Sequence, residues 1–597
     1  MTKARNVADI IKQPFTQTLG TSNYRAGVNA GNSITSGGNY NVTVGDEAGT
    51  AITTSSNNVL LGYQSGDEIT TGGSNVAVGM KALTTETEGS TAVAVGYSAL
   101  EAQNMGASTA NYNVAVGYKA GEAVTTGIQN TLMGGLAGDA LTDADKNVAF
   151  GYAALTSDTL GSRSVAIGNN ALNAQNFTTA TDTYNTAVGN NAGEAITTGD
   201  SNTLIGALAG DALTVGNSNV VMGLNSLGSD TKGDRSVAIG MAALSAQNFT
   251  TTTDTYNTAV GFAAGAAITT GVHNTLIGGA TGDALTDADY NVSLGYATLT
   301  ADTLGSKSVA LGSFTLANQN FTTATDTFNI AIGYASGLSV TTGIENTLIG
   351  GLAGDALTDA DYNVAIGVNA LSTDTLGSRS TAIGAAALNK QNFGTATDSH
   401  NTAVGFSAGK EVTTATLSTL IGSLAGDAIT TGSYNTAVGY SAAGAMTTGL
   451  ENTLTGALAG AAFTDADYNV AMGVQALAAD TKGNKSVAIG AQALFDQNFT
   501  TSTDALNVAV GYQAGTNVTT AIKNTHIGAF AGDSTTIGNY NTFLGYNAGD
   551  TNADGNQNTI VGGLANTAAT DGDFANGLGY SLNCVAGYTT LGKVNDD

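Results

Sequence analysis

A short pattern of apolar and polar positions recurs along almost the whole chain. It consists of Asn, then Val or Thr, then Ala or Leu, then Val or Ile, then Gly. Anchored on its Gly, the pattern has 32 copies between Gly45 and Gly592. Most anchors are separated by 17-residue steps and six by 21-residue steps, and three of the shorter steps with one of the longer form a 72-residue block. A unit this short, rich in Gly and β-branched residues, predicts strands and turns rather than helices.

Stacked copies of this unit predict an all-β fold, an elongated parallel β-solenoid or β-roll of about 32 coils. Neighbouring coils should then be about 4.8 Å apart, the distance between paired strands. The pattern divides the chain into three parts. We expect an N-terminal docking segment at 1–26, a repeat shaft at 27–579 and a C-terminal tip or cap at 580–597.

The three residues before each Gly are mostly apolar, and their positions predict which side of each strand points into the coil. The residue directly before Gly is apolar in 31 of 32 copies, and the one two places earlier is Val, Thr or Ile in 31 of 32. These two positions share one face of a strand, and we expect that face to line the inside of the coil. The Ala or Leu between them would then form a long outward stripe, which predicts packing against further copies of the chain. We expect an intertwined or side-by-side homotrimer.

Two other repeated positions predict how the turns are held. Four residues before the Gly stands Asn in 23 copies and Ser in six. In stacked coils these side chains can form hydrogen-bond ladders at a turn. The Gly itself indicates a positive φ or a close backbone approach.

Composition and charge exclude several classes of protein. The net charge is −28, from 46 acidic and 18 basic residues, so the chain lacks the basic surface that nucleic-acid binding needs. One Cys excludes a disulfide scaffold. The sequence has no run of 18 apolar residues and its start lacks the apolar stretch of a secretory signal, so we expect no membrane insertion and folding in a reducing cytoplasm.

The 21-residue steps contain a four-residue insertion after a Gln-Asn-Phe or Gln-Asn-Met triplet. Insertions in a solenoid map to one face and often form its binding face. Amides beside an exposed aromatic ring could hold a sugar; alternatively, the aromatic residue packs across a subunit boundary and the loop only decorates the shaft. The candidate surface-contact residues are Gln175, Asn176, Phe177, Gln247, Asn248, Phe249, Gln319, Asn320 and Phe321.

Other polar groups favour structural roles. Arg163 follows Asp158 by five residues, and the same spacing recurs in later blocks, so we expect local ion pairs at a corner. Thr-Asp-Ala-Asp segments such as 142–145 favour turns over a Ca²⁺ site. The three histidines share no repeat phase, and the lone Cys584 is expected in the core. We therefore predict no enzyme activity, no cofactor and no catalytic or metal-binding residue.

Four copies of the repeat share a five-residue motif that resembles one in a known protein family. Ser-Val-Ala-Ile-Gly stands at 164–168, 236–240 and 486–490, with a Leu variant at 308–312. This motif resembles the head repeat of trimeric autotransporter adhesins. That resemblance implies a parallel β-roll in which three chains associate.

A second resemblance is to bacteriophage tail-fibre shafts, through the Asn-Thr-(Leu/Ala)-(Ile/Val)-Gly units with their Ala-Gly and Thr-Thr-Gly turns. The opening, with Met1–Arg5 before Val7–Ile11, is similar to the N-termini of fibre-like proteins from marine phages. The ending at 588–593 looks like the stretch before an endosialidase-type chaperone domain. The start of the chain is basic and has a short amphipathic pattern, which predicts virion docking through Lys3, Arg5, Ile10, Ile11 and Lys12.

These features predict a structural fibre of a phage virion, a tail fibre, whose shaft contacts the host surface. Its expected partners are its own copies, other virion proteins at the N-terminus, and a host cell-surface glycan or protein. It would be assembled in the cytoplasm of the host bacterium. The main alternative is a bacterial, trimeric-autotransporter-like surface adhesin. An ice-binding solenoid and a polysaccharide-cleaving spike are two further alternatives.

Overall fold

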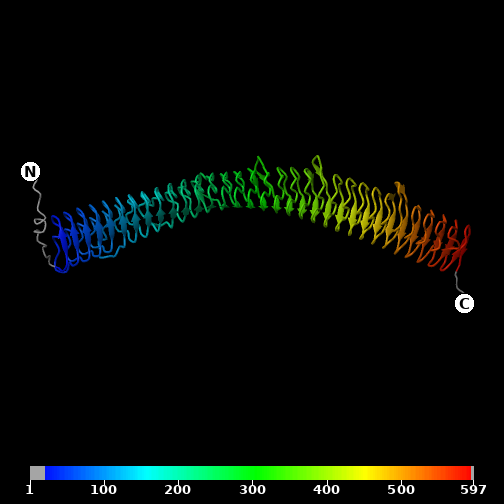
Figure 1. The fold of residues 1–597 in the computed structure, drawn as a ribbon, viewed down its shortest axis with the longest axis horizontal. Helices are drawn as coiled ribbons and strands as arrows, with labels where there is room; N and C mark the ends of the chain where they lie inside the picture. The colour runs from blue at the N-terminus through cyan, green and yellow to red at the C-terminus, as the bar shows by residue number, and fades with distance from the viewer. Residues whose placement is uncertain (1–19, 593–597) are drawn as a thin grey trace, which may run out of the picture. The chain divides into compact units, whose positions relative to one another are not determined.

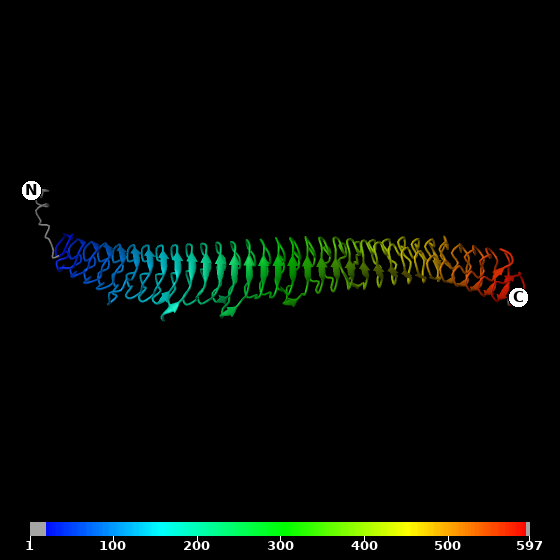
Figure 2. The same ribbon diagram turned by 90° about the horizontal axis from the view of Figure 1, so that it is seen from below.

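The computed structural model describes residues 20–592, which form an all-β parallel β-solenoid of about 33 turns. The chain divides into two compact units, an N-terminal unit that ends at Asn291 and a C-terminal unit that begins at Val292. In both units each turn contributes one short strand, and these strands lie side by side along the unit (Figure 1; Figure 2). None of the described residues forms a helix, so this part of the chain has no helix that could cross a membrane. The predicted fold class is confirmed.

The main strands are three residues long and end directly before the repeated Gly. In the N-terminal unit they are β1 (Tyr24–Ala26), β2 (Val42–Val44), β3 (Val59–Leu61), β4 (Val76–Val78), β5 (Val93–Val95), β6 (Val114–Val116), β7 (Thr131–Met133), β8 (Val148–Phe150), β10 (Val165–Ile167), β12 (Thr186–Val188), β13 (Thr203–Ile205), β14 (Val220–Met222), β16 (Val237–Ile239), β18 (Thr258–Val260) and β19 (Thr275–Ile277). In the C-terminal unit they are β20 (Val292–Leu294), β22 (Val309–Leu311), β24 (Ile330–Ile332), β25 (Thr347–Ile349), β26 (Val364–Ile366), β28 (Thr381–Ile383), β30 (Thr402–Val404), β31 (Thr419–Ile421), β32 (Thr436–Val438), β33 (Thr453–Thr455), β34 (Val470–Met472), β36 (Val487–Ile489), β38 (Val508–Val510), β39 (Thr525–Ile527), β40 (Thr542–Leu544), β41 (Thr559–Val561), β43 (Asn576–Leu578) and β45 (Thr589–Leu591).

Two-residue strands occur outside this row, most of them at the insertions. They are β9 (Gly161–Ser162), β11 (Thr181–Asp182), β15 (Gly233–Asp234), β17 (Thr253–Asp254), β21 (Gly305–Ser306), β23 (Thr325–Asp326), β27 (Gly377–Ser378), β29 (Thr397–Asp398), β35 (Gly483–Asn484), β37 (Thr503–Asp504), β42 (Asn566–Thr567) and β44 (Asn583–Cys584).

Successive turns pair in parallel and in the register that the repeat sets. Ala166 of β10 lies opposite Ala149 of β8, one 17-residue step earlier, and opposite Ala187 of β12, one 21-residue step later. A 21-residue step therefore keeps the strand register and places its four extra residues in a loop. The repeat also begins slightly before residue 27, because β1 at Tyr24–Ala26 already pairs with β2.

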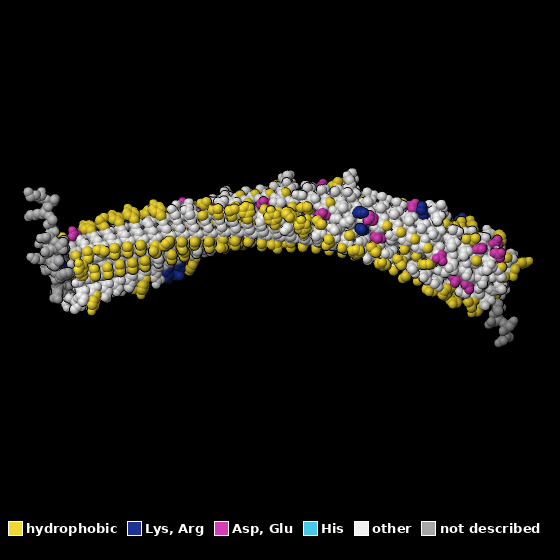
Figure 3. Space-filling model, viewed as in Figure 1, with side chains coloured by type: hydrophobic (Ala, Val, Ile, Leu, Met, Phe, Trp, Pro, Cys, Tyr) yellow, Lys and Arg dark blue, Asp and Glu magenta, His cyan; other side chains and the backbone are white. Residues whose placement is uncertain are grey.

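The strands face the opposite way from our prediction. The middle residue of the strand, such as Ala149 or Leu204, is fully buried inside the turn, whereas the residues on either side of it are partly or well exposed. The core is completed by aliphatic side chains from the far side of the turn, for example Ile196 and Leu213. Figure 3 shows long rows of apolar side chains over the N-terminal unit. Val, Thr and Ile therefore form the outer face of the strands, and Ala and Leu form the core.

The predicted roles of the repeated Gly and Asn are confirmed. Gly168 has φ +136°, and a Cβ placed on it would lie 2.2 Å from the carbonyl oxygen of Gly189 in the next turn. This close backbone approach leaves no room for a side chain. The buried Asn75 donates its backbone N–H to Oδ1 of Asn58 (2.9 Å) and its Nδ2 to the carbonyl of Gly89 (3.0 Å). Such contacts recur from turn to turn and connect the residue before each strand to its counterpart in the neighbouring turn.

Candidate interaction surfaces

Each insertion is anchored on a carboxylate buried in the preceding turn. Oδ1 of Asp158 accepts the backbone N–H groups of Gly161 (3.0 Å) and Phe177 (3.1 Å), and its Oδ2 accepts Nε2 of Gln175 (2.5 Å). The side chain of Asp158 is fully buried, and both of its oxygens accept hydrogen bonds. In the last copy of this site, burial raises the pKa of Asp480, while the hydrogen bonds from Gln497, Phe499 and Gly483 oppose the rise. The carboxylate thus fixes the base of the loop.

The Gln of the triplet connects this carboxylate to the Asn ladder. Nε2 of Gln175 also donates to Oγ of Ser164 (2.9 Å), and its Oε1 accepts Nδ2 of Asn185 (2.8 Å). The same arrangement is built around Gln247, Gln319, Gln391 and Gln497. These glutamines are buried and cannot reach an external partner.

The structure therefore separates the residues that the sequence grouped as surface contacts. Gln175, Gln247 and Gln319 are fully buried, and Phe177, Phe249 and Phe321 are at most 7% exposed. Asn176, Asn248 and Asn320 are exposed, as are the residues that follow each Phe, for example 178–180. A contact through these loops would thus be made by the Asn side chain and by the Thr-rich tip, with the Phe serving as an anchor within the same chain.

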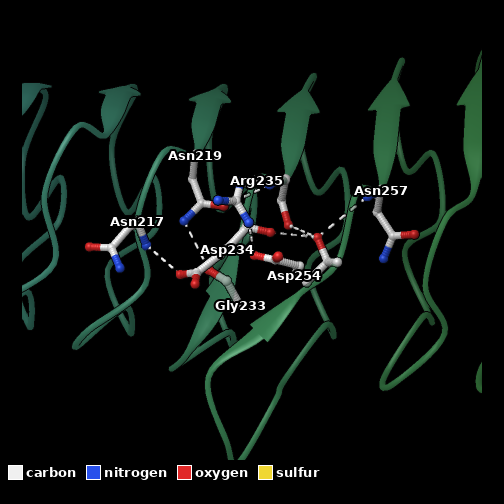
Figure 4. A network of polar contacts seen from close by, with 9 residues as sticks. Asn217, Asn219, Gly233, Asp234, Arg235, Asp254 and Asn257 are labelled. Atoms are coloured by element: carbon white, nitrogen blue, oxygen red, sulfur yellow. Dashed lines mark hydrogen bonds and ion pairs between the residues drawn. The ribbon is translucent and has the colours of Figure 1, made fainter.

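Beyond the tip, each of the last five insertions returns to the shaft through a small parallel sheet. In the second of these, Thr253–Asp254 (β17) pairs with Gly233–Asp234 (β15), and Asp254 forms an ion pair with Arg235 (Figure 4). In the same network, Asp234 accepts the backbone N–H of Asn217 (2.7 Å), and burial raises the pKa of Asp234.

The predicted local ion pair between residues five apart is wrong. Asp158 is buried under the loop, and Arg163 instead binds Asp182 in the insertion, with 2.8 Å between Nε and Oδ1. The equivalent pairs are Arg235–Asp254, Lys307–Asp326, Arg379–Asp398 and Lys485–Asp504. All of these pairs are exposed, so each contributes little to stability. Their role is to close the insertion onto the shaft.

The Thr-Asp-Ala-Asp segments also connect neighbouring turns. Asp143 accepts the hydroxyl of Thr126 (2.5 Å), and Asp145 accepts the backbone N–H of Ile128 (2.7 Å). Among residues 20–592, no group of three or more His, Cys, Asp or Glu side chains is placed to hold a metal ion. The aspartates here serve the turns of the solenoid.

Two of the three histidines illustrate how far the repeat tolerates replacement. His273 is stacked between Tyr256 (ring centroids 5.3 Å apart) and Tyr290 (4.8 Å). His526 stands in the core column, stacked on Phe543 at 5.1 Å, and neither of its ring nitrogens has a hydrogen-bond partner. Cys584 is buried, as expected. The predicted docking residues Lys3, Arg5, Ile10, Ile11 and Lys12 lie outside the described residues.

In comparisons with known proteins, no family model matches the chain and no curated protein matches it.

Proposed function

We propose that this chain is the shaft of a virion fibre, a phage tail fibre, which carries contacts for the host surface away from the particle. The observation that carries the proposal is the in-register stacking of about 33 turns with a recurring loop, whose copies follow one another at four intervals of 72 residues and one of 106. At about 4.8 Å per turn, the fifteen main strands of the N-terminal unit extend over roughly 70 Å, and the eighteen of the C-terminal unit over roughly 85 Å. Such units act as spacers.

The insertion loops supply a way to contact a surface repeatedly. Each loop is held at its base by a buried carboxylate and presents an exposed, Thr-rich tip, so all its copies are presented on rigid supports. Weak contacts from several tips to a cell-surface glycan or protein would add up by avidity. Other virion proteins would bind the basic N-terminal segment, and the fibre would be assembled in the host bacterial cytoplasm.

Two alternatives are less well supported by the contacts. An ice-binding surface would have to use the Thr-Thr pairs of the turns, but the first Thr of the pair is engaged within the stack: Oγ1 of Thr197 donates to the carbonyl of Thr214 at 3.1 Å. A cleaving spike needs a distinctive catalytic site, whereas the buried carboxylates here recur with the same structural partners. A bacterial surface adhesin with the same fold would share the stacked turns and the loops. It differs from a phage fibre in where it is displayed, on the bacterial envelope and not on the phage particle.

The proposal is tested by immunogold electron microscopy with antibody against the 72-residue block, applied to lysates and cells of the source. We expect gold on fibres that project from phage particles, at the tail. Gold on bacterial envelopes, with none on particles, would overturn the virion assignment in favour of the adhesin.

A further inference from the structure

A row of exposed, mostly aromatic residues runs along the C-terminal unit, one position after the repeated Gly, which we call the corner Gly of each turn. In the seventeen turns from β20 to β43 this position alternates without exception between a large residue, which is Tyr, Phe or Val, and a small one, which is Gly, Ala or Ser. Seven of the nine large residues are aromatic, and all nine are 50–62% exposed. We call these nine residues the rungs: Tyr296, Tyr334, Val368, Phe406, Tyr440, Val474, Tyr512, Tyr546 and Tyr580.

The small residues between the rungs leave space for the rings. A Cβ placed on Gly563 would lie 3.5 Å from Cδ2 and 3.6 Å from Cε2 of Tyr580, so this ring lies beside the small residue of the preceding turn. The fold does not require the alternation, because Tyr97 and Tyr118 of the N-terminal unit occupy the same position in successive turns. Their rings stack on each other, with centroids 5.5 Å apart. The alternation of the C-terminal unit instead keeps the rungs apart, at every second turn.

The strip that the rungs form is uncharged and bordered by amides. Neither the position after the corner Gly nor the next one carries a charged residue in these seventeen turns, although the net charge of the chain is −28. Amides stand directly after four rungs, at Asn369, Gln475, Gln513 and Asn547. Nε2 of Gln513 donates to Oε1 of Gln492 in the preceding turn (2.7 Å). Aromatic rings can pack against the C–H groups of a sugar ring, and amides can bond its hydroxyls, so this composition suits a neutral sugar.

We propose that the rungs bind an uncharged polysaccharide in an extended conformation, lying along the C-terminal unit. Successive sugars of a β-1,4-linked chain are turned over, so the same ring face recurs at every second sugar. The rungs recur at every second turn, about 9.6 Å apart, which is close to the length of two such sugars. Neighbouring rungs can therefore bind one polysaccharide chain together, and their weak contacts add up by avidity.

Charge determines which polysaccharide fits. The net charge of −28 would repel an anionic polysaccharide, whereas an uncharged one meets an uncharged strip. The rungs are different residues from those of the insertion loops. The inference therefore stands whether or not the chain belongs to a virion, and its tests are independent of the microscopy.

The first test measures the binding of hexasaccharides to the full-length chain by isothermal titration calorimetry. Cellohexaose and chitohexaose are uncharged and β-1,4-linked; maltohexaose is α-1,4-linked and curved, and a hexamer of β-1,4-linked mannuronate is anionic. We expect at least one of the first two to bind at least tenfold more tightly than maltohexaose, the mannuronate hexamer and its own disaccharide. Failure of both to bind, as expected if a protein chain covers the strip instead, would overturn the inference. A preference for maltohexaose or mannuronate would also overturn it.

The second test asks whether the rungs are the binding site. One variant combines Tyr296→Ser, Tyr334→Ser, Phe406→Ser, Tyr440→Ser, Tyr512→Ser, Tyr546→Ser and Tyr580→Ser. The control replaces with Ser six other exposed aromatic residues of the same unit, which stand five positions before the corner Gly: Phe328, Tyr362, Tyr434, Tyr468, Tyr540 and Phe574. We expect hexamer binding to weaken at least tenfold in the rung variant and to change less than twofold in the control. An equal effect of the two variants would contradict the assignment.

A smaller variant covers the case in which seven replacements disturb the fold, which circular dichroism detects. Tyr512→Ser, Tyr546→Ser and Tyr580→Ser remove three consecutive rungs, the length that one hexamer occupies. We expect fewer hexamers bound per chain, with the affinity of the remaining sites unchanged. The same number of hexamers per chain as in the wild type would show that the polysaccharide binds elsewhere.

Discussion

At the scale of single residues, the corner Gly of each turn is set by contact with the next turn. Gly350 has φ +137°, and a Cβ there would lie 2.5 Å from the carbonyl oxygen of Gly367. Its neighbour Gly351 has open space within 4 Å of the same position. We predict that Gly350→Ala costs about 3 kcal/mol or more, since it combines an unfavourable φ with a backbone clash. Gly351→Ala should be nearly neutral. Thermal unfolding of the two variants compares them directly, and equal midpoints would refute the explanation.

His526 makes the core sensitive to acid. Burial lowers its pKa to about 3, and its ring nitrogens have no partner. An unfolded His binds a proton near pH 6.5, so the free energy of unfolding falls as pH drops below that value, by about 2 kcal/mol at pH 5. His526→Leu, which restores a residue used elsewhere in this column, should remove this loss. Chemical unfolding at pH 5 and 7.5 measures it; an unchanged pH dependence in the variant would show that His526 is not the source.

Asp533 acts in the opposite direction. Burial, with the neighbouring Asp550 adding to it, raises the pKa of Asp533 to about 7. Between about pH 4 and 7 the folded state holds a proton that the unfolded state has lost, so stability decreases as pH rises through this window. Asp533→Asn should flatten this part of the pH profile and increase stability at pH 8. The exposed Asp571→Asn changes the net charge equally and should keep the wild-type slope. A variant less stable than wild type at pH 8 would contradict the prediction.

At the scale of one strand, the sequence predicted which residues pair but not which side of the strand is buried in the core. The spacing of the Gly anchors requires Val148 to lie opposite Val165, as observed. Alternation gives no direction here because Val-Ala-Phe and Val-Ala-Ile are apolar at every position. Size alone does not decide it either, because the buried middle position accepts Ala149 and Leu204 but also Phe543, whereas Phe150 at the third position lies outside.

At the scale of an insertion, the sequence showed where the loop begins but not what holds it. The partner of Asp158 is Gln175, one repeat length further along the chain, and the partner of Arg163 is Asp182, on the far side of the insertion. Both contacts join neighbouring turns, whereas the spacing of Asp158 and Arg163 in the sequence indicates a local pair that does not form. In a solenoid, contacts at one repeat length should be considered before local ones.

The buried carboxylate should control the opening of its loop. Asp230 accepts the backbone N–H groups of Gly233 (3.0 Å) and Phe249 (3.2 Å) and Nε2 of Gln247 (2.6 Å). We predict that Asp230→Ala leaves these donors unpaired and costs about 3 kcal/mol locally. Hydrogen exchange at residues 230–255 should then be about a hundredfold faster. Thr251→Ala, at the exposed tip, is the matched control and should not change exchange at the loop base. Similar exchange in both variants would mean that the carboxylate is not the anchor.

At the scale of the molecule, the 72-residue block is the unit by which the shaft can be lengthened or shortened. Four turns, one with an insertion, leave the strand register and the Asn ladder unchanged at the junction. Removing residues 190–261 joins Gly189 to Phe262, so that one corner Gly replaces another. We predict a folded protein whose N-terminal unit is shorter by about 19 Å, four strand spacings.

Removal of residues 190–253 provides the control, because this deletion does not remove a whole number of turns. It joins Gly189 to Asp254 and places the next anchor, Gly261, only eight positions after Gly189, too few for a turn. That variant should lose β structure around the junction and be cleaved there by protease, while the 72-residue deletion resists cleavage. Electron microscopy of both gives the contour lengths. If the two deletions behave alike, stability does not depend on register, and the recurring contacts from turn to turn would have to be secondary to the packing of the core.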